Sequence, residues 1–204
     1  MAEDNLFAEG AQLGVPYWWD DIDWPPLDAP PPKSVDLLVI GAGYTGLSAA
    51  IAAHDAGARV AVIDAGRPGR GASTRNGGMV GAHPRLPWEK LRDRFGEQTA
   101  DALFAEAATV LDWVRDLIAR EQISCDYQET GRIQLAYTKA QFQSQERLAR
   151  NVNTKSGARA QLVNAQGLAE EVNTPLYCGG LLYPDHGSLH PAKYHRGLLD
   201  AVLR

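Results

Sequence analysis

Two short apolar runs flank a longer alanine-rich run in the first third of the chain. The runs at residues 35–40 and 59–63 have the length and composition of buried strands. Between them, residues 47–56 are rich in alanine and are followed by Gly57, a residue type that commonly ends helices. The pattern therefore predicts a strand, a helix and a second strand within about 30 residues.

The remainder of the chain is mainly helical in its periodicity. Apolar residues recur at spacings of three and four between residues 89 and 121, where Gly96 is expected to separate two helices. Alternation at residues 127–137 predicts a strand. Further helices are expected at residues 139–155, 166–172 and 192–204.

The composition is that of an ordinary soluble globular protein of 204 residues, with 45% hydrophobic and 22% charged residues. The net charge of −5 argues against a nucleic-acid partner, which would favour a basic surface. Cys125 and Cys178 have neither zinc-site nor disulfide-framework spacing, so we expect reduced thiols and a cytoplasmic protein. The uncharged stretch at residues 37–53 contains three glycines and is short for a membrane span.

Residues 1–34 form a distinct acidic arm. Residues 1–32 carry seven acids, no lysine or arginine, six of the 12 prolines and three of the five tryptophans. Because prolines hold the backbone extended and tryptophans bury large apolar areas, we interpret the arm as a strap that docks on the protein body or on a partner subunit. The alternative is a mobile leader with a partly ordered aromatic patch.

The turn between the first strand and the helix reads GAGYTG and fits the GxGxxG pattern. Gly41 permits a tight turn, Gly43 permits close approach of a pyrophosphate, and Gly46 permits tight packing of the helix. The N–H groups at the helix start favour phosphate binding. Asp64, after the second strand, is suited to accept hydrogen bonds from ribose hydroxyls. Together these features predict a dinucleotide site.

Residues 66–81, GRPGRGASTRNGGMVG, contain six glycines in sixteen residues and are not expected to form a regular helix. Such a segment can bring backbone N–H groups and the side chains of Ser73, Arg75 and Asn76 close to a large ligand. The alternative is a flexible surface loop.

These motifs together resemble the D-amino-acid-oxidase-type family of flavoproteins. The resemblance rests on GAGYTG, Asp64, GASTRNGGM at residues 71–79, TGRIQLA at residues 130–136 and GGLLYPDHGSLHP at residues 179–191. Within the family, the chain is most similar to amine oxidases of the gamma-glutamylputrescine oxidoreductase and glycine oxidase types. Asp64 stands where many members have Glu, and Thr74 where the common pattern has Gly.

The resemblance implies FAD as the cofactor and an α/β, Rossmann-like FAD-binding domain carrying part of an inserted α+β substrate domain, which is incomplete in this chain. The expected cofactor-binding residues are Gly41, Gly43, Tyr44, Thr45, Gly46, Asp64, Ala65, Gly71, Ala72, Ser73, Arg75, Asn76, Gly77, Gly78 and Met79. The expected divisions are the arm (1–34), the first part of the FAD domain (35–120), a partial substrate domain (121–190) and a helix returning to the FAD domain (191–204).

By the same resemblance, the protein oxidises the C–N bond of a small amine or amino acid by hydride transfer to flavin, and the imine then hydrolyses. No catalytic acid or base is assigned, and the turn-rich spacing of His186, His190 and His195 disfavours a metal site. His83 is expected either to line the substrate side of the flavin or to be structural; Arg85 and Trp88 are candidates for contact with a substrate carboxylate.

Two alternatives remain. The first is a non-catalytic nucleotide-binding or assembly subunit that needs a second chain to complete its site. The second, an NAD-dependent dehydrogenase, is disfavoured by the 71–79 loop.

Overall fold

The computed structural model describes residues 14–27, 30 and 32–204, and the chain divides into two compact units. The first unit combines the N-terminal segment as far as Gly77 with Pro191–Arg204. The second unit is the intervening segment, Gly78–His190. The first part of the acidic arm, residues 1–13, and residues 28, 29 and 31 lie outside the described residues.

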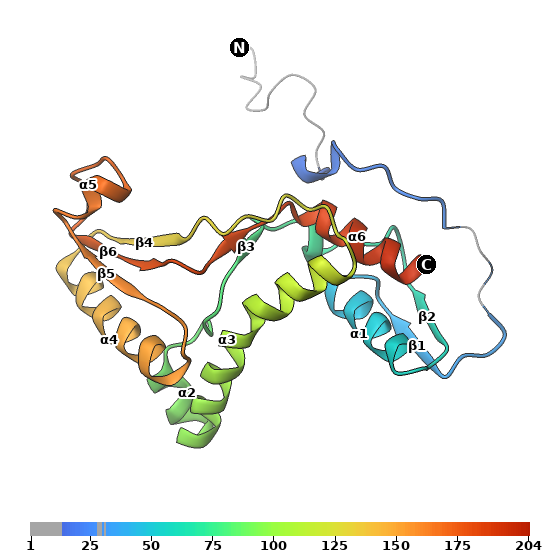
Figure 1. The fold of residues 1–204 in the computed structure, drawn as a ribbon, viewed down its shortest axis with the longest axis horizontal. Coiled ribbons are helices and arrows are strands. Elements are labelled where there is room, and N and C mark those ends of the chain that lie inside the picture. The colour runs from blue at the N-terminus through green and yellow to red at the C-terminus, as the bar shows by residue number, and fades with distance from the viewer. Residues whose placement is uncertain (1–13, 28–29, 31) are drawn as a thin grey trace, which may run out of the picture. The chain divides into compact units, whose positions relative to one another are not determined.

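The first unit is built on a parallel pair of strands joined by a helix (Figure 1). Strands β1 (Leu37–Ile40) and β2 (Val60–Ile63) pair in parallel, and helix α1 (Tyr44–Asp55) connects them. This arrangement confirms the predicted strand–helix–strand unit. The expected helix start at Leu47 was wrong: α1 already begins inside the glycine turn and includes Gly46, despite the low helix propensity of glycine.

Helix α6 (Pro191–Leu203) packs against α1 and contributes to the core of the first unit. The buried apolar side chains of the two helices are Leu47, Ala50 and Ile51 of α1 and Pro191, Ala192, Tyr194, Leu198 and Leu199 of α6. Two short 3₁₀ helices, η1 (Tyr17–Trp19) in the arm and η2 (Ala72–Thr74) in the glycine-rich loop, also lie next to α6.

The second unit contains a three-stranded antiparallel sheet in the order β4-β6-β5. Its strands are β4 (Arg132–Ala136), β5 (Gln161–Asn164) and β6 (Gly179–Tyr183). The strand expected at residues 127–137 is confined to β4, while Gln128 forms an isolated bridge to Ser188. A separate short pair joins β3 (Met79–Val80) to β7 (Gly187–Ser188).

Four helices complete the second unit. They are α2 (Trp88–Phe95), α3 (Glu97–Arg120), α4 (Lys139–Lys155) and α5 (Leu168–Glu171). Gly96 separates α2 from α3 with a φ of +84°, which confirms its predicted role and suits glycine because it has no Cβ. Helix α4 has the predicted bounds, and a reciprocal capping box of Thr138 and Gln141 fixes its start.

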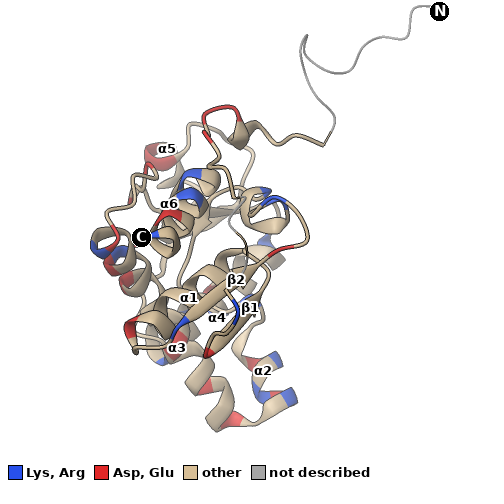
Figure 2. Ribbon diagram, turned by 90° about the vertical axis from the view of Figure 1, so that its right-hand side faces the viewer, with Lys and Arg blue, Asp and Glu red and all other residues tan. Residues whose placement is uncertain are grey.

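The core of the second unit lies between the helices and β6. Phe104, Val152, Leu181 and Tyr183 are almost completely buried there. Charged residues stay outside it, and α2 carries acidic and basic residues side by side (Figure 2). Helix α3 is the longest helix of the described chain, and no described helix is long and apolar enough to cross a membrane.

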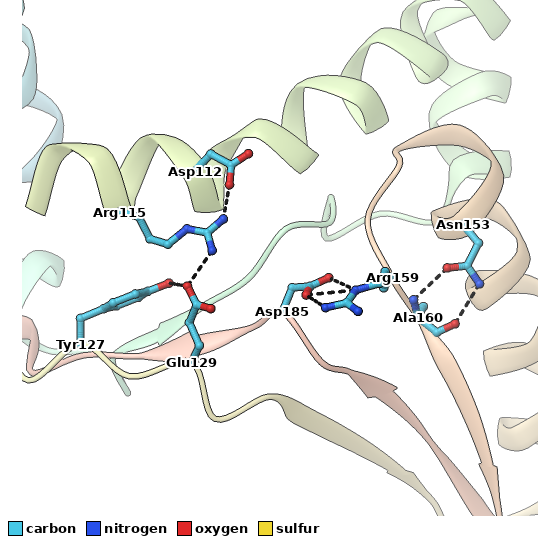
Figure 3. A network of polar contacts seen from close by, with 8 residues as sticks. All are labelled: Asp112, Arg115, Tyr127, Glu129, Asn153, Arg159, Ala160 and Asp185. Carbon is cyan, nitrogen blue, oxygen red and sulfur yellow. Dashed lines mark hydrogen bonds and ion pairs between the residues drawn. The ribbon is translucent and has the colours of Figure 1, made fainter. Parts of the chain in front are cut away.

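Polar contacts connect the helices and loops of the second unit (Figure 3). Arg115 of α3 pairs with Asp112 on the same helix and with Glu129 in the segment before β4. Arg159 pairs with Asp185, which joins the segment before β5 to the turn after β6. These ion pairs are partly exposed, so we expect each to stabilise the fold only modestly.

Candidate dinucleotide-binding site

The glycine turn lies between the end of β1 and the start of α1. Gly41 has a φ of +104°, a conformation that side chains disfavour, and its N–H donates to the Ile63 carbonyl at 2.7 Å. A Cβ on Gly46 would lie 1.9 Å from the Gly41 carbonyl oxygen. The helix therefore approaches the turn too closely for any residue larger than glycine at this position.

Helix α1 presents its N-terminus at this turn. Gly43 is the N-cap residue and supplies no capping side chain; instead, the Tyr44 N–H donates to the Ser73 hydroxyl at 3.1 Å. A Cβ on Gly43 would lie 3.0 Å from that hydroxyl oxygen. The absence of a side chain at Gly43 thus lets the Ser73 hydroxyl approach the start of α1 closely. The aligned peptide dipoles of α1 favour an anion at the same place.

Asp64 follows β2 directly and is tied to the glycine turn. One carboxylate oxygen accepts the Ala42 N–H at 2.7 Å, and the other accepts the Gly66 N–H at 3.0 Å. The side chain belongs to an exposed residue at the end of the parallel pair. The two bonds fix the orientation of the carboxylate beside the turn, where the sequence analysis placed the ribose-binding acid.

The glycine-rich loop is held by hydrogen bonds to its own backbone. Thr74 is fully buried and donates to the Gly69 carbonyl at 2.7 Å. The Asn76 amide donates to the carbonyls of Ala72 and Ser73 at 3.1 and 3.0 Å. These bonds give the loop a defined path around the N-terminus of α1.

His195 of α6 is part of the site and was not identified as such from the sequence. Its Nε2 lies 2.7 Å from the Ala42 carbonyl oxygen, so this nitrogen carries the hydrogen and donates. Burial lowers the pKa of His195, although the bond to Ala42 acts in the opposite direction. A Cβ on Gly69 would lie 2.7 Å from the His195 ring, so the ring also supports the glycine-rich loop.

Most of the expected cofactor-binding residues gather in the first unit. This unit contains the residues of the glycine turn, Asp64, Ala65 and residues 71–77. The Tyr44 N–H and the Ser73 hydroxyl form a direct hydrogen bond. Gly78 and Met79 belong to the second unit, where Met79 begins β3. Arg75 directs its guanidinium to the arm and donates to the Gly14 carbonyl at 2.7 Å.

The second unit contains a separate cavity of about 540 Å³. His83, Arg85 and Arg132 are among the residues that line it. The rings of His83, Tyr183 and His186 are mutually stacked, with centroids 4.5 to 5.2 Å apart. The cationic lining makes the cavity suitable for a ligand that carries a carboxylate.

Two other candidates from the sequence have structural partners. Trp88 donates its indole N–H to Asp101 at 2.7 Å, within the helical part of the second unit. The His186 Nε2 accepts the Ala82 N–H at 3.0 Å, and burial lowers the pKa of His186 to about 4. No group of three metal-binding side chains occurs within the described residues.

Comparison with known proteins gives matches over most of the chain. Residues 36–204 match the family model of the FAD dependent oxidoreductases, DAO. The chain is 34% identical to gamma-glutamylputrescine oxidoreductase of Escherichia coli K12 over 167 residues, which cover 82% of this chain and 39% of that protein.

Solved structures give the same match at the level of fold. Glycine oxidase from Geobacillus kaustophilus has a TM-score of 0.66 at 21% identity, covering 83% of this chain and 44% of that one. L-amino acid deaminase from Proteus vulgaris has a TM-score of 0.68 at 18% identity, covering 89% of this chain and 40% of that one. The chain therefore spans well under half the length of each of these proteins.

Proposed function

The chain belongs to the family of FAD-dependent oxidoreductases, and on that basis we propose that its first unit binds the ADP part of FAD in an enzyme that oxidises an amine or amino acid. The observation that carries the proposal is the joining of Asp64 to the glycine turn through the Ala42 N–H at 2.7 Å. This bond brings an acid suited to ribose and a turn suited to pyrophosphate to the same end of the parallel pair.

The residues present fit this cofactor. Gly46 lets α1 start directly against the Gly41 backbone, and Gly43 adds no side chain at the N-terminus of α1, whose dipole favours the negative charge of a pyrophosphate. Asp64 would accept hydrogen bonds from the ribose hydroxyls, and its charge disfavours a 2′-phosphate. Ser73 and the backbone of residues 71–77 would follow the cofactor from the helix start.

FAD, when bound, supplies an acceptor for the hydride of the carbon next to the substrate nitrogen. The contribution of the protein is to hold the cofactor, orient the substrate and exclude water. Arg85 and Arg132 line the cavity of the second unit, so we assign them to recognition of a substrate carboxylate. This assignment favours an amino acid, or an amine that carries a carboxylate, as the substrate.

We also propose that the protein works in the cytoplasm. The support is chemical: Cys125 and Cys178 are both free thiols, as expected in a reducing compartment. Fractionation of the source cells into cytoplasmic and exported fractions, probed with an antibody against the chain, tests this assignment. Recovery in the exported fraction would contradict it.

The test of the cofactor assignment is a visible spectrum of the purified chain after incubation with FAD and removal of the excess. We expect a bound flavin band in the wild type and its loss in Asp64→Ala, with Asp116→Ala, an exposed acid on α3, as the matched control. Anaerobic addition of amino acids and amines should then bleach the band. A colourless wild-type chain that binds NAD instead would overturn the proposal.

A further inference from the structure

The described part of the arm lies on the glycine-rich loop of the first unit. Three hydrogen bonds join the two segments, and each of them crosses between residues 14–19 and residues 74–76. The arm thus contacts the same loop that supplies Ser73 to the N-terminus of α1. This contact raises the question of what the arm does for the candidate cofactor site.

Trp19 makes the most buried of these contacts. Its indole N–H donates to the Thr74 hydroxyl at 2.7 Å, and that hydroxyl donates in turn to the Gly69 carbonyl at 2.7 Å. Thr74 has no exposed surface. The indole therefore completes the hydrogen bonding of a buried hydroxyl, an arrangement that is costly to disrupt.

Trp18 and Arg75 make the second and third contacts. The Trp18 indole N–H donates to the Asn76 carbonyl at 2.8 Å. In the opposite direction, the Arg75 guanidinium donates to the Gly14 carbonyl at 2.7 Å and to the Arg70 carbonyl of its own loop at 2.8 Å. The loop is thus bonded to the arm on both sides of Arg75.

Charge and aromatic contacts support the same pairing. The Arg67 guanidinium lies 3.8 Å from the centroid of the Trp19 ring and 5.1 Å from that of Trp24. The described arm before residue 30 carries three acids and no basic residue, whereas residues 66–77 carry three arginines and no acid (Figure 2). Trp24 extends the contact to the His195 ring, at a centroid distance of 5.8 Å.

We propose that Trp18 and Trp19 are positioning residues for the cofactor: they hold residues 69–76 at the N-terminus of α1, and the arm thereby sets how tightly FAD is retained. The inference rests on the proposed FAD site. The physical link is short, because Ser73 is adjacent to Thr74 and accepts the Tyr44 N–H at 3.1 Å. Release of Thr74 would free Ser73 to leave the helix start.

The test uses Trp18→Phe, Trp19→Phe and the double variant in the full chain. Phenylalanine keeps an aromatic ring and removes the N–H donor, so the packing of the arm changes little. Trp113→Phe, at a half-exposed position on α3 of the second unit, is the matched control. Amide hydrogen exchange of residues 66–77 is measured without cofactor, and the Kd for FAD is measured by flavin fluorescence.

For Trp19→Phe we expect roughly tenfold faster exchange in the loop and a roughly tenfold higher Kd, the effect of one lost hydrogen bond. The double variant should exceed either single variant, and Trp113→Phe should match the wild type. Exchange in β1 and α1 should change little, because the change is local to the loop.

Two results would overturn the inference. One is unchanged loop exchange in the double variant; the other is faster exchange with an unchanged Kd, which would reduce the arm to a purely structural role. A wild-type chain that takes up no FAD would overturn the proposed function as well as the effect on affinity. The exchange measurement distinguishes these cases, because it reports on the contact between arm and loop without cofactor.

Discussion

The imidazole of His195 donates to the carbonyl of Ala42 across 2.7 Å, although the two residues are 153 positions apart in the sequence. The N–H of the same Ala42 donates to Asp64. The carbonyl and the N–H of Ala42 are therefore both hydrogen-bonded, the carbonyl to His195 of α6 and the N–H to Asp64 at the end of β2. The glycine turn is held from two sides before any ligand is present.

Replacement of His195 should loosen this turn. His195→Phe keeps an aromatic ring but removes the donor to Ala42, leaving a buried carbonyl without this partner. We expect a loss of about 1–3 kcal/mol in the free energy of unfolding, measured by urea denaturation. His54→Phe, at an exposed position of α1, is the control; an equal loss in both variants would contradict the role of the bond.

Alanine at Gly46 should be more damaging. Its Cβ would lie 1.9 Å from the Gly41 carbonyl oxygen, which is backbone and cannot rotate away. We expect Gly46→Ala to cost about 3 kcal/mol in unfolding free energy and to abolish FAD uptake. In Gly66→Ala, the nearest atom to the new Cβ would be Arg70 Nη1 at 3.7 Å, an ordinary contact, so this variant should remain stable. Equal stabilities would show that the turn can relax.

Acid should destabilise the protein through His186. Its folded pKa is lowered from 6.5 to about 4 by burial, with His83 and Arg132 acting in the same direction. The unfolded chain therefore takes up the proton first, and stability is lost as the pH falls from 6.5 towards 4. Relative to His186→Gln, the wild type should lose about 2 kcal/mol between about pH 7 and pH 5. Parallel urea titrations of the two proteins that show the same pH dependence would contradict this prediction.

The two thiols should differ in reactivity. Burial raises the pKa of Cys125 to about 11, so little thiolate forms there at neutral pH, whereas Cys178 is only partly buried. A thiol-specific reagent at about pH 7.5 should label one cysteine per native chain and both in denaturant. Peptide mapping should place the native label on Cys178. Rapid native labelling of Cys125 would show that its region opens readily.

The parts of the fold that follow from local patterns could be predicted from the sequence. The strand–helix–strand unit, the break at Gly96 and the bounds of α4 all depend on local periodicity and on glycine or capping residues. Strand β6 could not be predicted in this way, because it begins with two glycines and is buried along most of its length, so it shows no alternation. Its position depends on pairing with β4 and β5.

The residues of the candidate site likewise fall into those that local sequence patterns predict and those that depend on the tertiary fold. The glycine turn and Asp64 are contiguous motifs and could be recognised from their spacing. His195 could not, because its role depends on the return of α6 to the turn, which no local pattern encodes. The aromatic residues of the arm indicated a docking segment, but its target, Thr74, became apparent only from the structure.

The described arm contacts segments that lie far from it in the sequence. Trp19 is 55 residues from Thr74, and Trp24 is 171 residues from His195. Closing such long loops costs conformational entropy, so we expect the contacts of the arm to form after the local structure of the glycine-rich loop and of α6. The second unit is contiguous in sequence, so its contacts close shorter loops than the contact between Trp24 and His195 of α6. Trp19 lacks its partner until Thr74 has been synthesised, and Trp24 lacks its partner until His195 has been synthesised, so binding of this segment by a chaperone would be most useful during that period.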